Sequence, residues 1–334
     1  MKKMIPLFLA LTMAVGLLAG CGKKNATESG ESESDKLRVV ATIFPGYDWV
    51  HQIMGDRAAA ADLTMLLDNG VDLHSYQPTT DDIIKVFDCD LFIYVGGESD
   101  GWAENALKTA ANKDIKVVSL LEVLGERVKT EEIVEGMQDA DHAHAHDHEH
   151  EHDHGEEKDE HVWLSLKNAK TLVGAIADAL QELDPDNKDT YAANASAYIE
   201  KLSALDGAYQ SAVDSAARKT VLFGDRFPFR YLVDDYGLRY YAAFAGCSAE
   251  SEASFETVSF LAKKVDELGL PCVLTIEGKN HKLAETIVRS TAGKNQKVLT
   301  MDSMQSMTSK DAANGATYLS VMEQNLSVLK EALG

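Results

Sequence analysis

Short β-branched runs alternate with segments of helical periodicity along the first third of the chain. The runs are apolar and bounded by turn residues, as is typical of buried strands. They occupy residues 37–43, 60–66, 91–95 and 116–119. The helical segments occupy residues 47–55, 81–86 and 102–111. Strand and helix in alternation predict βαβ units, a mostly parallel sheet and therefore an α/β domain.

Two long helical patterns follow at residues 166–183 and 188–217. In the second, apolar residues recur every three to four positions and form one stripe. They are Tyr191, Ala195, Tyr198, Leu202, Leu205 and Tyr209. We expect this helix to be a rigid backbone between two domains, because it is unusually long for a connector.

A second α/β block is predicted after the long helix. Its expected strands are residues 220–223, 239–244, 272–275 and 298–301. Its expected helices are residues 229–235, 254–268, 282–291 and 314–333. The 334 residues also suggest roughly two domains of ordinary size.

The N-terminus reads as a targeting segment. Lys2 and Lys3 precede an apolar run at residues 5–18, and the segment ends in Leu18-Ala19-Gly20-Cys21. A Cys in this place resembles a bacterial lipobox, so Cys21 is predicted to carry the lipid; the alternative is a plain secretory signal. No later run is long and apolar enough to span a bilayer. We therefore expect an extracytoplasmic protein, lipid-anchored to the outer face of the bacterial cell membrane.

These patterns predict five regions in the chain. Residues 1–21 are the lipoprotein signal peptide, and residues 22–36, rich in Ser and Glu, are a flexible tether. An N-terminal lobe is expected at 37–187 with a histidine-rich loop at 141–160, a linking helix at 188–218 and a C-terminal lobe at 219–334.

The histidine-rich loop contains a tract in which His alternates with mostly acidic residues. Its histidines are His142, His144, His146, His148, His150, His152 and His154. Nothing apolar larger than Ala interrupts the tract, so it is expected to be a solvated loop that captures zinc weakly at several places. The alternative is a chance low-complexity tract. Two H-E-x-x-H matches inside it carry no weight, because that motif needs an apolar helix. His161 differs, since it opens the apolar segment His161-Val162-Trp163-Leu164.

Charge and cysteine content narrow the possible functions. The formal charge of -22 argues against nucleic-acid binding, which needs clusters of Lys and Arg, and acids around the tract would attract cations. Apart from Cys21, the cysteines are Cys89, Cys247 and Cys272, so at most one disulfide can form among them.

Ligands of doubly wound sheets bind at the carboxyl ends of the strands. Metal-binding side chains just after predicted strands, or after the tract, are therefore candidate ligands. They are His74, His161, Asp225, Glu277, His281 and Asp302. A single loop His is more often an ordinary surface residue, but several such residues, mostly just beyond strands, favour a metal site.

Several motifs together resemble the solute-binding proteins of bacterial zinc and manganese ABC importers, over nearly all of residues 37–334. They are the lipobox, His74-Ser75-Tyr76-Gln77-Pro78-Thr79, the histidine-rich insertion, His161-Val162-Trp163-Leu164, Tyr236-Gly237-Leu238, the segment 248–254 and Leu283-Ala284-Glu285-Thr286-Ile287. The resemblance implies two α/β lobes joined by one long helix, with a metal in the cleft between them. It also implies that His74 and His161 are ligands from the first lobe and that Asp302 is a candidate from the second. The implied partners are a membrane permease and its cytoplasmic ATPase, and the chain is expected to be a monomer.

One position departs from that family. The His or Glu usually found about ten residues before Tyr-Gly-Leu falls on Arg226, which has no lone pair for a metal. The substitutes are His281, Glu277 and Asp225; His281 is favoured as the only histidine of the second lobe, although it could instead be an exposed residue capping a helix. Cys247 is a weaker candidate. Three His and one carboxylate would favour Zn²⁺, whereas two His with carboxylates would favour Mn²⁺.

Two other functions compete with a metal receptor. A zinc metalloenzyme would keep an open coordination position and a general base beside it, but no Ser-His-Asp order, phosphate loop or helical zincin motif is present. The other is a surface adhesin that binds metal incidentally. We therefore expect a non-enzymatic receptor that captures Zn²⁺.

Overall fold

The computed structural model describes residues 36–110, 112–138, 157–248, 252–278 and 280–334. Residues 36–334 form one compact unit, and the expected signal peptide, Cys21, nearly all of the tether and the histidine tract lie outside the described residues. Among the helices described, none is both long and apolar enough to cross a bilayer.

The first sheet is parallel, with strand order β2-β1-β3-β4. Its strands are β1 (Arg38–Ala41), β2 (Asp62–Met65), β3 (Leu91–Tyr94) and β4 (Lys116–Ser119). Its connecting helices are α1 (Phe44–Met54), α2 (Thr80–Asp88), α3 (Gly101–Thr109) and the short α4 (Leu120–Leu124). Helix α1 begins earlier than predicted, because Pro45 lies in its first turn, where a missing N–H costs no hydrogen bond.

The second sheet is also parallel, with strand order β6-β5-β7-β8. Its strands are β5 (Thr220–Phe227), β6 (Arg239–Ala245), β7 (Cys272–Thr275) and β8 (Lys297–Thr300). Helices α7 (Arg230–Tyr236), α8 (Phe255–Leu268) and α9 (Lys282–Ser290) connect them. The two parallel sheets confirm the predicted α/β class.

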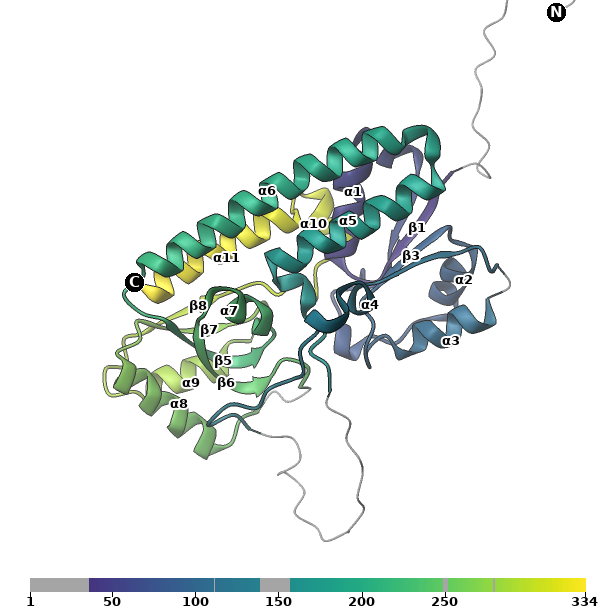
Figure 1. Ribbon diagram of the computed structural model, residues 1–334. Coiled ribbons are helices and arrows are strands. Elements are labelled where there is room, and N and C mark those ends of the chain that lie inside the picture. The colour runs from purple at the N-terminus through teal and green to yellow at the C-terminus, as the bar shows by residue number, and fades with distance from the viewer. Residues whose placement is uncertain (1–35, 111, 139–156, 249–251, 279) are drawn as a thin grey trace, which may run out of the picture. The chain divides into compact units, whose positions relative to one another are not determined.

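The long helix α6 (Lys188–Ser215) lies between the two sheets in the chain and runs beside α5 (Leu166–Leu183) and α11 (Tyr318–Leu333) (Figure 1). Every residue of its predicted apolar stripe is buried. The stripe packs into a hydrophobic core that also contains residues of both sheets. The predicted helix joining two lobes is thereby confirmed.

Several predicted elements differ from the structure at their ends, and strand β5 and helix α11 differ most. Strand β5 continues to Phe227 through a bulge after Phe223, because it goes on pairing with β6; Asp225 therefore lies within the strand and not beyond it. The helix predicted at 314–333 is α11, which begins only at Tyr318, and a separate short helix, α10 (Ser309–Ala313), precedes it. Gly315, at a φ of 96°, separates them, and Thr317 caps α11 with its side chain.

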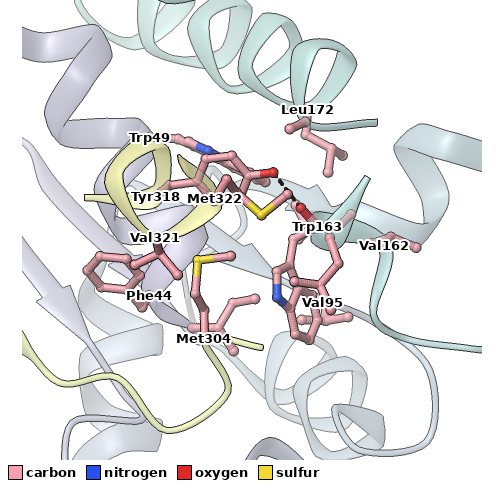
Figure 2. Packing of buried hydrophobic residues seen from close by; sticks show 14 of the residues in the cluster. Phe44, Trp49, Val95, Val162, Trp163, Leu172, Met304, Tyr318, Val321 and Met322 are labelled. Atoms are coloured by element: carbon pink, nitrogen blue, oxygen red, sulfur yellow. Dashed lines mark hydrogen bonds between the residues drawn. The ribbon is translucent and has the colours of Figure 1, made fainter. Parts of the chain in front are cut away.

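A buried contact ties the segment after His161 to the C-terminal part of the chain. The Trp163 indole N–H donates to the Ser303 carbonyl at 2.8 Å, and the Tyr318 hydroxyl donates to the Trp163 carbonyl at 2.6 Å. Met304 and Met322 fill the space beside these rings (Figure 2). This packing holds the loop that carries His161 rigidly against residues 301–322.

Candidate metal centre

His74 and His161 face one another through their outer ring nitrogens. His74 lies in a 3₁₀ turn (Leu73–Ser75), and His161 immediately precedes another (Val162–Leu164). Their Nε2 atoms are 3.0 Å apart, although 87 positions separate the residues in the chain. A tetrahedral Zn²⁺ holds two nitrogens about 3.3 Å apart, so a small displacement would admit the ion between them.

The inner nitrogen of each ring is bound by a neighbouring side chain. His161 Nδ1 lies 2.8 Å from Asp159 Oδ1, and His74 Nδ1 lies 2.9 Å from Ser99 Oγ. Glu160 Oε2 lies 3.6 Å from His74 Nδ1. Such contacts fix the ring orientation of a metal-binding histidine and direct its free nitrogen toward the ion.

The two histidines differ in their affinity for protons. Burial and the neighbouring His161 lower the pKa of His74 to about 3. Burial also opposes charge on His161, but the adjacent Asp159 carboxylate outweighs it and raises the pKa of His161. An added proton is therefore held more tightly by His161 than by His74, and the His74 imidazole stays neutral and able to bind a cation.

The structure adds a third donor to this pair. One ligand atom each from His74, His161 and Cys247 lie within 4.8 Å of one another. A second group joins Glu131, Asp159 and His161. Burial and the carboxylates of Glu131 and Asp159 raise the pKa of the Cys247 thiol, so it is protonated without a metal.

The other predicted ligands lie in separate hydrogen-bonded clusters. His281 Nδ1 is 3.2 Å from Thr275 Oγ1, which donates to Asp225 Oδ2 at 2.5 Å. Glu277 accepts hydrogen bonds from the backbone N–H and hydroxyl of Ser303, and burial and Asp302 raise the pKa of Glu277 to about 7. Within the described residues, the two ligand groups that include His161 contain none of His281, Glu277, Asp225 or Asp302.

Arg226, at the position where the resembled family usually has a ligand, pairs with Asp72. Its Nη2 atom lies 2.6 Å from Asp72 Oδ2. Asp72 also accepts the backbone N–H of His74 at its other oxygen, 3.0 Å away. The guanidinium is thus neutralised by the carboxylate that shapes the His74 turn.

A cavity of about 680 Å³ lies beside this ion pair. Residues from both halves of the unit line it, among them Asp72, Asp225, Arg226, Glu277, Asn280 and Lys282. Apolar side chains, among them Phe244, Ile276 and Leu283, line other parts of the cavity.

Several residues around the histidines were missed by sequence analysis. They are Ser99, Glu131, Asp159, Glu160 and Gln305. Asp159 and Glu160 directly precede His161, so their place in the sequence was a usable signal. Ser99, Glu131 and Gln305 are brought to the site only by folding.

All three described cysteines, Cys89, Cys247 and Cys272, are free, so the disulfide that sequence analysis allowed does not form among them. Cys89 and Cys272 are buried, whereas Cys247 is partly exposed.

The chain matches known proteins over almost its whole length. The family model described as zinc-uptake complex component A, periplasmic, matches residues 39–332. The zinc-binding lipoprotein AdcA of Streptococcus pneumoniae is 32% identical over 99% of this chain and 61% of its own length. The high-affinity zinc uptake system protein ZnuA of Bacillus subtilis is 30% identical over 95% of this chain and 94% of its own. The chain thus spans less than two thirds of the AdcA relative.

Solved structures of related proteins are also similar to this chain. The Zn(II)-bound ZnuA-like domain of S. pneumoniae AdcA superposes with a TM-score of 0.67 at 30% identity, covering 89% of this chain and 99% of that domain. The metal-dependent lipoprotein YcdH of B. subtilis superposes with a TM-score of 0.70 at 27% identity, covering 89% and 99%. The chain therefore belongs to the family of the periplasmic zinc-uptake complex component A.

Proposed function

We propose that this protein is a metal-binding receptor that captures Zn²⁺ outside the cytoplasm and delivers it to the membrane permease of an ABC importer with its cytoplasmic ATPase. The observation that supports this most directly is the pair of facing Nε2 atoms of His74 and His161, 3.0 Å apart. Each ring is oriented by a further side chain, as in sites built for a metal. The names of the zinc-binding and zinc-uptake relatives support the same ion.

In this proposal His74 and His161 hold the ion from the first lobe, and a donor from the second lobe closes the site. The sequence predicts His281 together with Asp302 for that role, with Glu277 and Asp225 as further candidates. The ion is cargo and has to leave again, so the protein needs no catalytic base beside it. The receptor is not proposed to be an enzyme.

Competition between metals on the purified protein tests the proposal. Calorimetry should show one tight site for Zn²⁺ and weaker binding of Mn²⁺. His74→Ala should weaken tight zinc binding at least roughly 10- to 100-fold, and His51→Ala is the matched control because His51 packs against Tyr47 on α1. A parent protein that prefers Mn²⁺, or a His74→Ala variant that binds zinc like the parent, would contradict the proposal.

We further propose that Cys21 carries a lipid that anchors the protein to the membrane. The support is the apolar segment ending at Cys21 and the word lipoprotein in the name of the AdcA relative. Cys21→Ala should release the protein from the membrane fraction of its own cells without changing metal binding. A processed variant that stays in the membrane would show that the anchor lies elsewhere.

A further inference from the structure

We infer that Cys247 is a second-lobe ligand of this site, so that two imidazoles and one thiolate bind Zn²⁺. The inference rests on the proposed function, since it assigns a further ligand to the same site. It also names the class of cargo: a divalent cation with affinity for sulfur, and not Mn²⁺, which prefers oxygen ligands.

Position is the first argument. Cys247 follows β6 (Arg239–Ala245), and its Sγ atom belongs to the group with His74 and His161 whose ligand atoms lie within 4.8 Å of one another. Asp159 and Ser99 occupy the inner nitrogens of the two histidines, so the outer nitrogens, which face one another at 3.0 Å, are the ones that can bind an ion. With Zn–N of about 2.0 Å and Zn–S of about 2.3 Å in a tetrahedral site, each nitrogen lies about 3.5 Å from the sulfur, so the sulfur needs to approach the nitrogens by about 1.3 Å at most.

The chain around Cys247 is built for close approach to His161. A Cβ atom on Gly246 would lie 2.9 Å from His161 Cε1 and 2.9 Å from the Phe227 carbonyl, so only glycine fits there. The backbone N–H of Cys247 donates to Glu131 Oε1 at 3.0 Å, which anchors the loop in this place.

Two buried oxygens close to His74 favour positive charge in this part of the site. Glu160 Oε2 and Gln305 Oε1 have no hydrogen-bond partner in the described structure, and both residues are 2% exposed. Glu160 Oε2 points at His74 Nδ1 from 3.6 Å. Buried oxygens without partners are costly, and a positive ion beside His74 would offset that cost.

Binding is a ligand exchange without oxidation or reduction. The Cys247 S–H bond breaks and the sulfur electron pair binds Zn²⁺. Its proton leaves to the solvent, together with the proton that His161 Nε2 gives up when this nitrogen binds the ion. The thiolate and the carboxylate of Asp159, which is hydrogen-bonded to His161, offset the two positive charges of the ion. Arg226 takes no part, because its guanidinium faces Asp72.

Cobalt substitution of the full chain tests the inference, because a thiolate bound to Co²⁺ gives an intense near-ultraviolet charge-transfer absorption. The parent should show this band and Cys247→Ser should lose it. Cys272→Ala is the matched control, since Cys272 is a buried thiol on β7, and it should keep the band. Cys247→Ser should also weaken zinc binding at least roughly ten-fold and leave Mn²⁺ binding unchanged.

A measurement on the parent alone removes any dependence on the folding of the variant. Stoichiometric Zn²⁺ should protect Cys247 from alkylation, as judged by peptide mass spectrometry. Alkylation at the same rate with and without Zn²⁺, a parent without the band, or a Cys247→Ser variant that keeps it would overturn the inference.

The outcomes also separate this inference from the proposed function. If Cys247→Ser binds zinc like the parent while His74→Ala does not, the receptor function stands and the thiolate ligand is rejected. If the parent has no tight zinc site, the receptor function itself fails. His281→Ala tests the competing ligand and should keep the cobalt band.

Discussion

An ion pair between Asp72 and Arg226 joins the turn that carries His74 to the end of strand β5, with 2.6 Å between Oδ2 and Nη2. Asp72 uses its other oxygen to accept the backbone N–H of His74. The residue at the family's usual ligand position therefore contacts the metal centre indirectly, through the carboxylate that shapes the His74 turn.

Arg226→Ala should change zinc affinity much less than His74→Ala, because the guanidinium has no lone pair for the ion. The ion pair lowers the pKa of Asp72, so its loss should raise that pKa. Calorimetry of Arg226→Ala, Asp72→Asn and the double variant measures the coupling between the two side chains. An Arg226→Ala variant as weak as His74→Ala would mean that the arginine determines the position of His74.

Zinc affinity should fall as the pH is lowered through the raised pKa of His161, because a proton competes with the metal for the imidazole. Asp159→Asn removes the carboxylate that raises this pKa, so the loss of affinity should move to lower pH. Zinc titrations of both proteins between about pH 5 and about pH 8 measure how zinc affinity depends on pH in each. Identical pH profiles would show that another group carries the competing proton.

Asp302→Asn tests the carboxylate that the family resemblance implies as a candidate ligand. If Asp302 binds the ion in addition to His74, His161 and Cys247, the variant should weaken tight zinc binding at least roughly ten-fold, because the amide carries no charge. The change keeps the oxygen that accepts the Met304 N–H at 2.7 Å, so the local turn should survive. Glu277→Gln is the paired variant, since Glu277 lies against the same segment. Parent-like binding by Asp302→Asn would remove this carboxylate from the ligand set.

Deleting residues 142–154 should remove several weak zinc sites and leave the tight one. Alternating His and acidic residues in a solvated loop lack neighbours that fix their geometry, so they should bind zinc only weakly. Calorimetry of the deletion variant counts both classes of site. Loss of the tight site would place the principal metal site in the tract.

Asp100→Asn should flatten the pH dependence of unfolding in the metal-free protein. Burial raises the pKa of Asp100 from 3.8 to about 7, so the folded protein keeps a proton that the unfolded chain loses at lower pH. Asp100 therefore makes the free energy of unfolding fall as the pH rises from about 4 to about 7. Asparagine can still accept the Val95 and Gly96 N–H groups at that position. Denaturant unfolding of the parent and the variant across this range measures how the free energy of unfolding depends on pH. The same dependence in both proteins would show that other groups cause it.

The sequence by itself determined the α/β class, most element positions and the long helix. Apolar residues at helical spacing form the buried face of a helix, and the stripe from Tyr191 to Tyr209 is buried along α6. Strand β4 and helix α5 have the predicted ends because turn and capping residues flank them. His74 and His161 were selected from motifs, and the structure brings them together.

Only the tertiary structure decided which side chains meet across the site. Strand β5 runs past its predicted end because it pairs with β6, and that pairing places Asp225 within the strand. Cys247 lies close to His74 and His161, Arg226 pairs with Asp72, and Ser99 binds His74. The residues in these pairs are 25 to 173 positions apart in the chain (247 - 74 = 173). Sequence periodicity reports burial of single elements, whereas such distances depend on how the two sheets pack around α6 and α11, and no local pattern encodes that packing.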